Sequence, residues 1–337
     1  MKTRTQLWTG ITACLGLLVL ILDAKTALSG AREGVELCLY TVLPSLFPFF
    51  ILSVLINRSF TGRKIKILRP IGIACGIPEG AESLLLLGFL GGYPVGAQSI
   101  HEAYEGKSLN RHDAHRMLGF CSNAGPAFIF GIAGSLFERK AIPWVLWGIH
   151  IISALLVGLI LPHKTKHLVK MSQASPVTIP QAVERSMKTI AVVCSWVIVF
   201  RVVLTFCQRW FLWLLPQQIQ IGLVGLLELS NGFIELHSVT SQGVRFIISA
   251  GILSFGGICV ALQTVSITRE LGTGMYFPGK ILQAGISILI AAILQRLLFS
   301  SSDQSSIPVI CYAISAAMIG SFLFCLYHKK KVVALPC

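Results

Sequence analysis

Long, almost uncharged stretches alternate with short polar segments along this chain. Eight of these stretches approach the roughly 20 residues that a helix needs to cross a bilayer. They cover residues 7–22, 37–56, 117–137, 141–162, 189–207, 246–268, 281–295 and 307–327. The pattern predicts an all-α polytopic membrane protein with about eight transmembrane helices.

Two further apolar stretches are interrupted by residues that break helices or carry charge. Glycines and Pro94 interrupt residues 83–100. Glu228 and Asn231 interrupt residues 210–236. Non-helical backbone persists at membrane depth only where protein or a water-filled cavity satisfies its polar groups. Both stretches are therefore predicted to be re-entrant hairpins.

The interruptions recur at similar spacing in the two halves of the chain. Gly88 precedes Phe120 by 32 residues, and Gly225 precedes Phe255 by 30. Each half is predicted to contain one span, one hairpin, one broken span and one intact span, in that order. In the first half these elements lie at 35–56, 77–100, 117–137 and 141–162. In the second half they lie at 186–207, 215–237, 246–268 and 278–295. Three crossings are an odd number, so the repeat is predicted to be inverted, with the hairpin tips meeting near the membrane midplane.

The predicted domain organisation follows from this repeat. It comprises an N-terminal transmembrane helix at 1–29, a first repeat at 30–165, a cytoplasmic linker at 166–185, a second, inverted repeat at 186–300, and a C-terminal transmembrane helix with a basic tail at 301–337. The first apolar run can also be read as a signal peptide. Residues 23–30 offer no clear cleavage site, so we expect the helix to be retained.

Composition and charge agree with a membrane protein. The chain is 54% hydrophobic and 12% charged, whereas about a quarter of the residues in a soluble domain are charged. The formal charge of +14 does not indicate nucleic-acid binding, because the basic residues sort by loop. With both termini in the cytoplasm, 20 of the 28 Lys and Arg residues, Lys280 among them, fall on the cytoplasmic side. The expected partners are a lipid bilayer and a small-molecule solute, and a homo-oligomer is left open.

The first hairpin and the broken span after it carry candidate solute-binding residues. The candidates in the hairpin are Gly91, Gly92, Tyr93, Pro94 and Gly96. Glycine permits close approach to backbone N–H groups, and a half-helix N-terminus attracts anions, although close helix packing explains the glycines equally well. In the broken span, Ser122 and Asn123 can orient a solute or coordinate Na⁺. A helix merely kinked at Pro126 is the alternative.

The second half supplies a matching set of candidates. They are Glu228, Ser230, Asn231, Gly256, Gly257 and Gln263. A carboxylate inside the membrane points to function, so Glu228 is a candidate for binding a coupling proton. Arg201 lies in mid-span, where it can bind a solute carboxylate or pair with Glu228 or Glu235. His150 stands alone on an apolar span and is expected to pack.

The sequence does not predict an enzyme. No P-loop, H-E-x-x-H motif or nucleophile–base arrangement occurs. The ten cysteines form no C-x-x-C pair that would indicate zinc or a disulfide framework. The connection at 98–116 is rich in His and acidic residues and is expected to be solvated, with a metal cluster as the alternative. No cofactor is expected, and H⁺ or Na⁺ is left open as a coupling ion.

Several short motifs in order resemble one known family. They are LPSLFPFF at 43–50, GGYPVGA at 91–97, the stretch 120–130, LE at 227–228 through Gly232, and SFGG at 254–257 with Gln263. Over about residues 30–300 they resemble the YlbJ-type sporulation integral membrane proteins of the nucleoside-recognition Gate group. The resemblance implies a layout similar to that of concentrative nucleoside transporters, whose solute lies between two hairpins and two unwound helices.

The resemblance further implies a role in endospore formation, as a carrier of dipicolinate in the outer forespore membrane of the mother cell. Dipicolinate is an aromatic dicarboxylate, for which the glycine-tip amides, Tyr93, Asn123 and Arg201 form a reasonable anion site. The expected function is alternating-access transport of a small anionic solute in the cell membrane or outer forespore membrane. A carrier of a nucleoside-like solute and a non-transporting scaffold of the spore envelope are the competing hypotheses.

Overall fold

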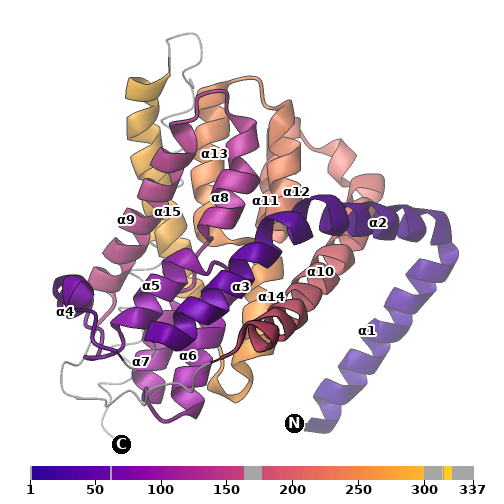
Figure 1. Ribbon diagram of the computed structural model, residues 1–337. Coiled ribbons are helices and arrows are strands. Elements are labelled where there is room, and N and C mark those ends of the chain that lie inside the picture. Colours follow the sequence, from indigo (N-terminus) through magenta and orange to yellow (C-terminus); the bar gives the residue numbers. More distant parts are fainter. Residues whose placement is uncertain (1, 61–62, 163–176, 300–312, 314, 321–337) are drawn as a thin grey trace, which may run out of the picture.

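The computed structural model describes residues 2–60, 63–162, 177–299, 313 and 315–320 (Figure 1). In these ranges the chain is helical and forms no strand. The helices are α1 (Lys2–Leu22), α2 (Ala24–Leu37), α3 (Leu43–Phe60), α4 (Arg69–Ala74), α5 (Glu82–Leu90), α6 (Val95–Glu105), α7 (Arg111–Leu118), α8 (Pro126–Gly131), α9 (Ile142–Ile160), α10 (Ile179–Trp210), α11 (Gln217–Leu227), α12 (Leu229–Glu235), α13 (Gln242–Phe255), α14 (Gly257–Thr268) and α15 (Tyr276–Leu298). The predicted all-α class is confirmed for this part of the chain.

Five helical stretches are long and apolar enough to cross a membrane. They are Ala24–Asn57, Ile142–Ile160, Ile179–Trp210, Gln242–Leu271 and Tyr276–Leu298. Each overlaps one of the predicted spans. Shorter apolar helices at Gly10–Leu22 and Pro126–Leu136 fall on two more. The eighth predicted span, 307–327, lies mostly outside the described residues, so the count of eight stays a prediction.

Helix α2, just before the predicted span at 37–56, is a helix that the sequence pattern did not predict. Asp23 caps α2 by accepting a hydrogen bond from Thr26 N at 3.3 Å. A π-helical turn at Cys38–Val42 carries the chain into α3. Glycine lets α2 lie against α10, since a methyl group on Gly34 would be 2.9 Å from the Cα of Ile198. The buried face of α2, with Thr26, Gly30 and Gly34, therefore belongs to a helix interface.

The two hairpins approach the middle of the molecule from opposite ends (Figure 1). In that view α5 and α6 form the first hairpin in the lower half, and α11 and α12 form the second in the upper half. The two broken helices, α7 with α8 and α13 with α14, run in opposite directions between the same two ends. Helix α15 packs on α9 and α13, and α10 packs on α2 and α3. Both hairpin tips and both helix breaks thus lie near the centre.

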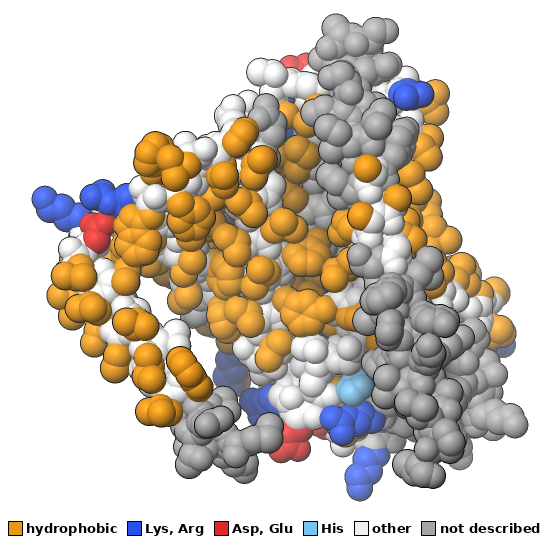
Figure 2. All heavy atoms as spheres, turned by 180° about the vertical axis from the view of Figure 1, so that it is seen from behind, with side chains coloured by type: hydrophobic (Ala, Val, Ile, Leu, Met, Phe, Trp, Pro, Cys, Tyr) orange, Lys and Arg blue, Asp and Glu red, His pale blue; other side chains and the backbone are white. Residues whose placement is uncertain are grey.

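Large hydrophobic side chains cover the outside of the helices. Trp144, Ile152, Val199 and Leu297 are all exposed. Figure 2 shows such side chains spread over the middle of one face, with charged side chains at its margins. A soluble protein rarely exposes a contiguous apolar surface of this extent, whereas a lipid-facing helix does so without penalty. The exterior agrees with an integral membrane protein.

Candidate functional site

The turn between α5 and α6 forms the tip of the first hairpin. Gly92 has a φ of 74°, in the left-handed region that favours glycine. A methyl group on Gly92 would lie 2.9 Å from Gly125 N, and one on Gly96 would lie 2.4 Å from the Cys121 carbonyl oxygen. The glycines therefore pack the hairpin against the break between α7 and α8. Gly91 and Gly92 also line a pocket, so close packing and pocket lining occur together.

Glu228 alone separates α11 from α12 and forms the tip of the second hairpin. Its backbone is extended, and its carboxylate accepts hydrogen bonds from N and Nδ2 of Asn231, both at 2.7 Å. The carboxylate thereby caps α12. A methyl group on Gly232 would lie 2.4 Å from the Cα of Gly225, so the two arms touch through their backbones. The buried carboxylate is held in place by the helix that it caps.

Both broken helices are interrupted where the sequence predicted it. Helix α7 ends at Leu118, and α8 begins at Pro126. Gly256 separates α13 from α14 with a φ of 84°, and Gly257 follows with 83°. A methyl group on Gly256 would lie 3.0 Å from the Tyr93 hydroxyl oxygen. The break of the second half therefore contacts the hairpin tip of the first half.

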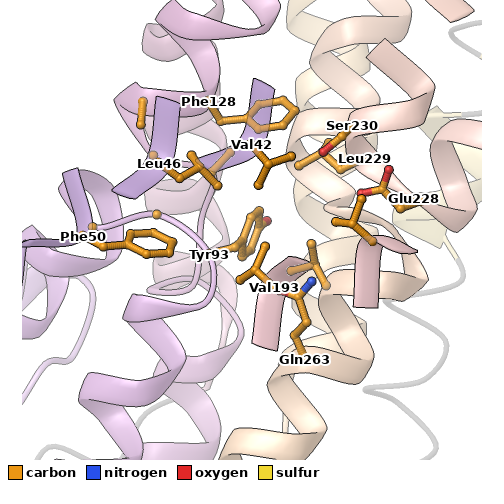
Figure 3. A pocket seen from close by; sticks show the side chains of 17 residues that line it. Val42, Leu46, Phe50, Tyr93, Phe128, Val193, Glu228, Leu229, Ser230 and Gln263 are labelled. Atoms are coloured by element: carbon orange, nitrogen blue, oxygen red, sulfur yellow. The ribbon is translucent and has the colours of Figure 1, made fainter. Parts of the chain in front are cut away.

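A pocket lies where the two tips meet the two broken helices (Figure 3). Its cavity volume is about 40 Å³, and the space that it spans together with its opening to the outside is about 500 Å³. It is lined by Val42, Leu46, Phe50, Gly91, Gly92, Tyr93, Ala124, Gly125, Ala127, Phe128, Val193, Val197, Glu228, Leu229, Ser230, Val260 and Gln263. In Figure 3 Tyr93 stands between Phe50 on one side and Glu228 with Ser230 on the other. Aromatic walls with a few polar groups are typical of small-molecule sites.

Some of the predicted site residues line the pocket, and the others lie outside its lining. Gly91, Gly92, Tyr93, Glu228, Ser230 and Gln263 line it. The supporting positions in the tips, breaks and adjoining helices are Pro94, Gly96, Ser122, Asn123, Asn231, Gly256 and Gly257. The lining also includes aliphatic and aromatic residues of α3, α8 and α10 that the sequence reading did not select. Their apolar character marked them only as part of a membrane helix.

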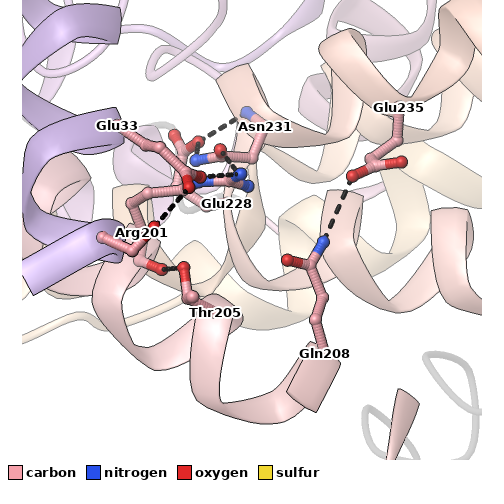
Figure 4. Close-up of polar contacts among 8 residues, drawn as sticks. Glu33, Arg201, Thr205, Gln208, Glu228, Asn231 and Glu235 are labelled. Atoms are coloured by element: carbon pink, nitrogen blue, oxygen red, sulfur yellow. Dashed lines mark hydrogen bonds and ion pairs between the residues drawn. The ribbon is translucent and has the colours of Figure 1, made fainter. Parts of the chain in front are cut away.

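Arg201 is paired with a residue other than the solute carboxylate, Glu228 or Glu235 that the sequence suggested (Figure 4). Its Nε donates to Oε2 of Glu33 at 2.9 Å, and its Nη2 donates to the same oxygen. Its Nη1 donates to Oδ1 of Asn231 at 3.1 Å. Glu235 instead accepts a hydrogen bond from a glutamine of α10. A direct pair with Glu228 or Glu235 is therefore wrong, and Arg201 reaches Glu228 only through Asn231.

Lys280 is a second charged residue whose surroundings differ from the prediction. The charge count places it in the cytoplasm, but its side chain is completely buried near the start of α15. Its Nζ donates to Oδ1 of Asn123 at 3.0 Å and to Oε1 of Gln283 at 2.6 Å, and it lies 5.2 Å from the centre of the Tyr93 ring. Glycines allow this approach because they let the backbone of α15 touch the end of α7.

His150 takes part in a closed set of hydrogen bonds, so the expected apolar packing is wrong. Its Nε2 accepts a hydrogen bond from Ala124 N at 3.0 Å. Because a backbone N–H can only donate, the ring proton sits on Nδ1 and is donated to Ser254 Oγ at 3.1 Å. The bonds continue through Ser287 and Ser153 back to the His150 carbonyl. The set ties α9 to α13, α15 and the first break.

The connection between the first hairpin and its broken helix is only partly solvated. Helix α7 begins at Arg111, with Asn110 as its cap, and both Asp113 and Arg116 are buried. Arg116 donates to three backbone carbonyl oxygens. Among the residues that the structure describes, no group of three or more His, Cys, Asp or Glu side chains could hold a metal ion.

The chain is similar in sequence to a known sporulation protein. It is 25% identical over 328 residues to the sporulation integral membrane protein YlbJ of Bacillus subtilis (strain 168), a match that covers 82% of this chain and 79% of that protein. No family model matches the chain. No solved structure matches it either. The chain is thus a helical membrane protein with a sporulation homologue, while the Gate and dipicolinate assignments rest on the motifs alone.

Proposed function

We propose that this protein is a membrane carrier of a small anionic solute. The observation that supports the proposal is the central pocket. It is bounded by both hairpin tips, by Gly125 in the break between α7 and α8, and by α14, which follows the break at Gly256. Interrupted segments at corresponding positions of two halves are typical of a transporter's central site. A protein with a purely architectural role has no need to assemble both tips around a hollow.

The arrangement of the two halves supports alternating access. The hairpins approach from opposite ends, and the broken helices run in opposite directions (Figure 1). In the proposed membrane orientation both hairpins are re-entrant, and eight spans leave both termini in the cytoplasm. The pseudo-twofold axis that relates the two repeats then lies in the membrane plane. Rocking of one half against the other would then open the central pocket to one side at a time.

The proposed solute is dipicolinate or a similar aromatic dicarboxylate, carried during endospore formation across the cell or outer forespore membrane. Similarity to YlbJ supports the sporulation role. The aromatic rings of Phe50, Tyr93 and Phe128 in the pocket wall suit an aromatic solute. Arg201 is removed from the proposed anion site, because its guanidinium is paired with Glu33. No enzymatic step is proposed, and Glu228 is the proposed site of a coupling proton.

A nucleoside-like solute is the second candidate. The polar groups of the pocket wall favour it, because the carboxylate of Glu228, the hydroxyl of Ser230 and the amide of Gln263 can all bind sugar hydroxyls or base edges. A carrier of this class would accept neutral solutes and would not depend on their negative charge.

Flux measurements on the purified protein in liposomes test these proposals. We expect saturable uptake of dipicolinate above that of nucleosides. Glu228→Gln should lower the flux by at least about tenfold, whereas Glu184→Gln, at an exposed glutamate of α10 paired with Lys188, should leave it unchanged. Nucleoside flux without dipicolinate flux would favour the second candidate. No flux of either solute under any ion gradient, from folded protein, would favour the envelope scaffold.

A further inference from the structure

Lys280 lies in the interior without a negatively charged partner in the described part of the chain. Its contacts, the oxygens of Asn123 and Gln283 and the ring of Tyr93, are all uncharged. An ammonium group removed from water is unfavourable unless a counter-charge accompanies it. An ionisable side chain in a membrane segment is therefore a candidate for function.

Three buried or partly exposed arginines are compensated in ways that Lys280 is not. Arg201 is paired with Glu33, and Arg69 is paired with Glu82. Arg116 donates to carbonyl oxygens at the C-terminal ends of α4 and α9, where the helix dipole is negative. Lys280 lies near the N-terminal end of α15, where the dipole instead adds positive potential.

Lys280 is separated from the pocket by single side chains. Tyr93 lines the pocket and lies over Nζ, and Asn123 directly precedes the pocket-lining Ala124. The hydroxyl groups of Tyr93 and Ser122 are buried and have no hydrogen-bond partner among the residues that the structure describes. Tyr93 lines the pocket, and an unpaired hydroxyl donor in a pocket wall is a group that a carboxylate binds.

We propose that Lys280 selects the charge of the solute, whose carboxylate binds on the Tyr93 side of the pocket, closest to Nζ. The inference rests on the proposed function and names the residue that makes the carrier prefer anions. Glu228 lies on the opposite side of Tyr93 from Phe50 and comes from the other half (Figure 3).

Three pyridines that share one ring provide the test: the 2,6-dicarboxylate, the 2-carboxylate and the neutral 2,6-dicarboxamide. Their equilibrium binding is measured with the purified protein in lipid nanodiscs. The wild type should prefer the anions by about tenfold for each negative charge. Lys280→Gln should lose this preference and keep its dicarboxamide affinity within about twofold. Lys280→Arg should retain the preference, as should Lys188→Gln, which removes an exposed lysine.

A second variant keeps the ammonium group paired in case Lys280→Gln does not fold. Gln283→Glu places a carboxylate where Oε1 now lies 2.6 Å from Nζ, so it should also abolish the anion preference. An unchanged ratio of dicarboxylate to dicarboxamide affinity in either folded variant overturns the role of Lys280 and leaves the proposed carrier standing. A folded wild type that binds none of the three ligands overturns the proposed solute class, and the inference with it.

Discussion

Arg201 of α10 and Glu33 of α2 form an ion pair that joins the start of the first repeat to the start of the second repeat. The same guanidinium holds Asn231, whose backbone and side-chain nitrogens hold the Glu228 carboxylate (Figure 4). A line of polar contacts thus runs from the outer helix α2 to the tip of the second hairpin. The orientation of the pocket carboxylate depends on a residue that does not line the pocket.

Removing either member of this pair should destabilise the protein. Glu33 is partly exposed, so solvent screening limits the coupling to about 1 kcal/mol. We expect Arg201→Gln and Glu33→Gln to be less than additive in a double-mutant cycle of unfolding in detergent. Additive effects would show that the pair contributes no coupling.

A methyl group on Gly279 should separate α15 from the end of α7. It would lie 2.3 Å from the Gly119 carbonyl oxygen, and backbone cannot rotate away as a side chain can. We expect Gly279→Ala to lower the free energy of unfolding by about 2–3 kcal/mol. Gly148→Ala is the matched control, because nothing lies within 4 Å of its added methyl group. The control should be neutral or stabilising by up to about 1 kcal/mol.

Replacing His150 should loosen the first break. His150→Leu leaves the buried Ala124 N–H without its acceptor, which costs about 1–3 kcal/mol, and it also opens the set of serine bonds. Thermal unfolding should show a clear loss relative to Ser195→Ala. Ser195 is an exposed serine of α10 bonded only within its own helix. Equal stability of the two variants would argue against the hydrogen-bonded set.

Gly256→Ala should impair transport more than Gly272→Ala, although the backbone at Gly272 is at least as strained for an alanine. Gly256 has a φ of 84° and a ψ of −15°, which costs an alanine about 1–2 kcal/mol, and Gly272 has a φ of 76° and a ψ of −178°, in a region that glycine alone adopts readily. Only the methyl group at Gly256 would press on Tyr93, at 3.0 Å, whereas nothing lies within 4 Å of one at Gly272. The difference in flux between the two variants in liposomes therefore isolates the contact with the pocket. Equal flux would show that this contact has no role.

The positions of the helix interruptions were predictable because their causes are local. Pro126 opens α8, Glu228 stands between α11 and α12, and Gly256 stands between α13 and α14, each at an interruption in the apolar pattern. Backbone freedom, a missing N–H and the cost of a buried charge act at the residue itself. For the same reason the apolar runs predicted the long helices.

The partners of the buried charges were not predictable from the sequence. Glu33 is 168 residues from Arg201, and Lys280 is 157 residues from Asn123. The rule that sorts basic residues by loop placed Lys280 in the cytoplasm, because it counts charges near helix ends and takes no account of the helices packed around them. His150 looked isolated for the same reason, since Ser254 and Ser287 lie on other helices.

The sequence by itself determined an all-helical membrane protein, the positions of its long apolar helices and the places where the apolar segments break. Only the tertiary structure decided which polar groups meet: Arg201 with Glu33, Lys280 with Asn123, and His150 with Ser254. The physical reason is that periodicity and helix breaking act over a few residues along the chain. Buried polar groups are instead satisfied by whichever groups the packing of distant helices brings within hydrogen-bonding distance.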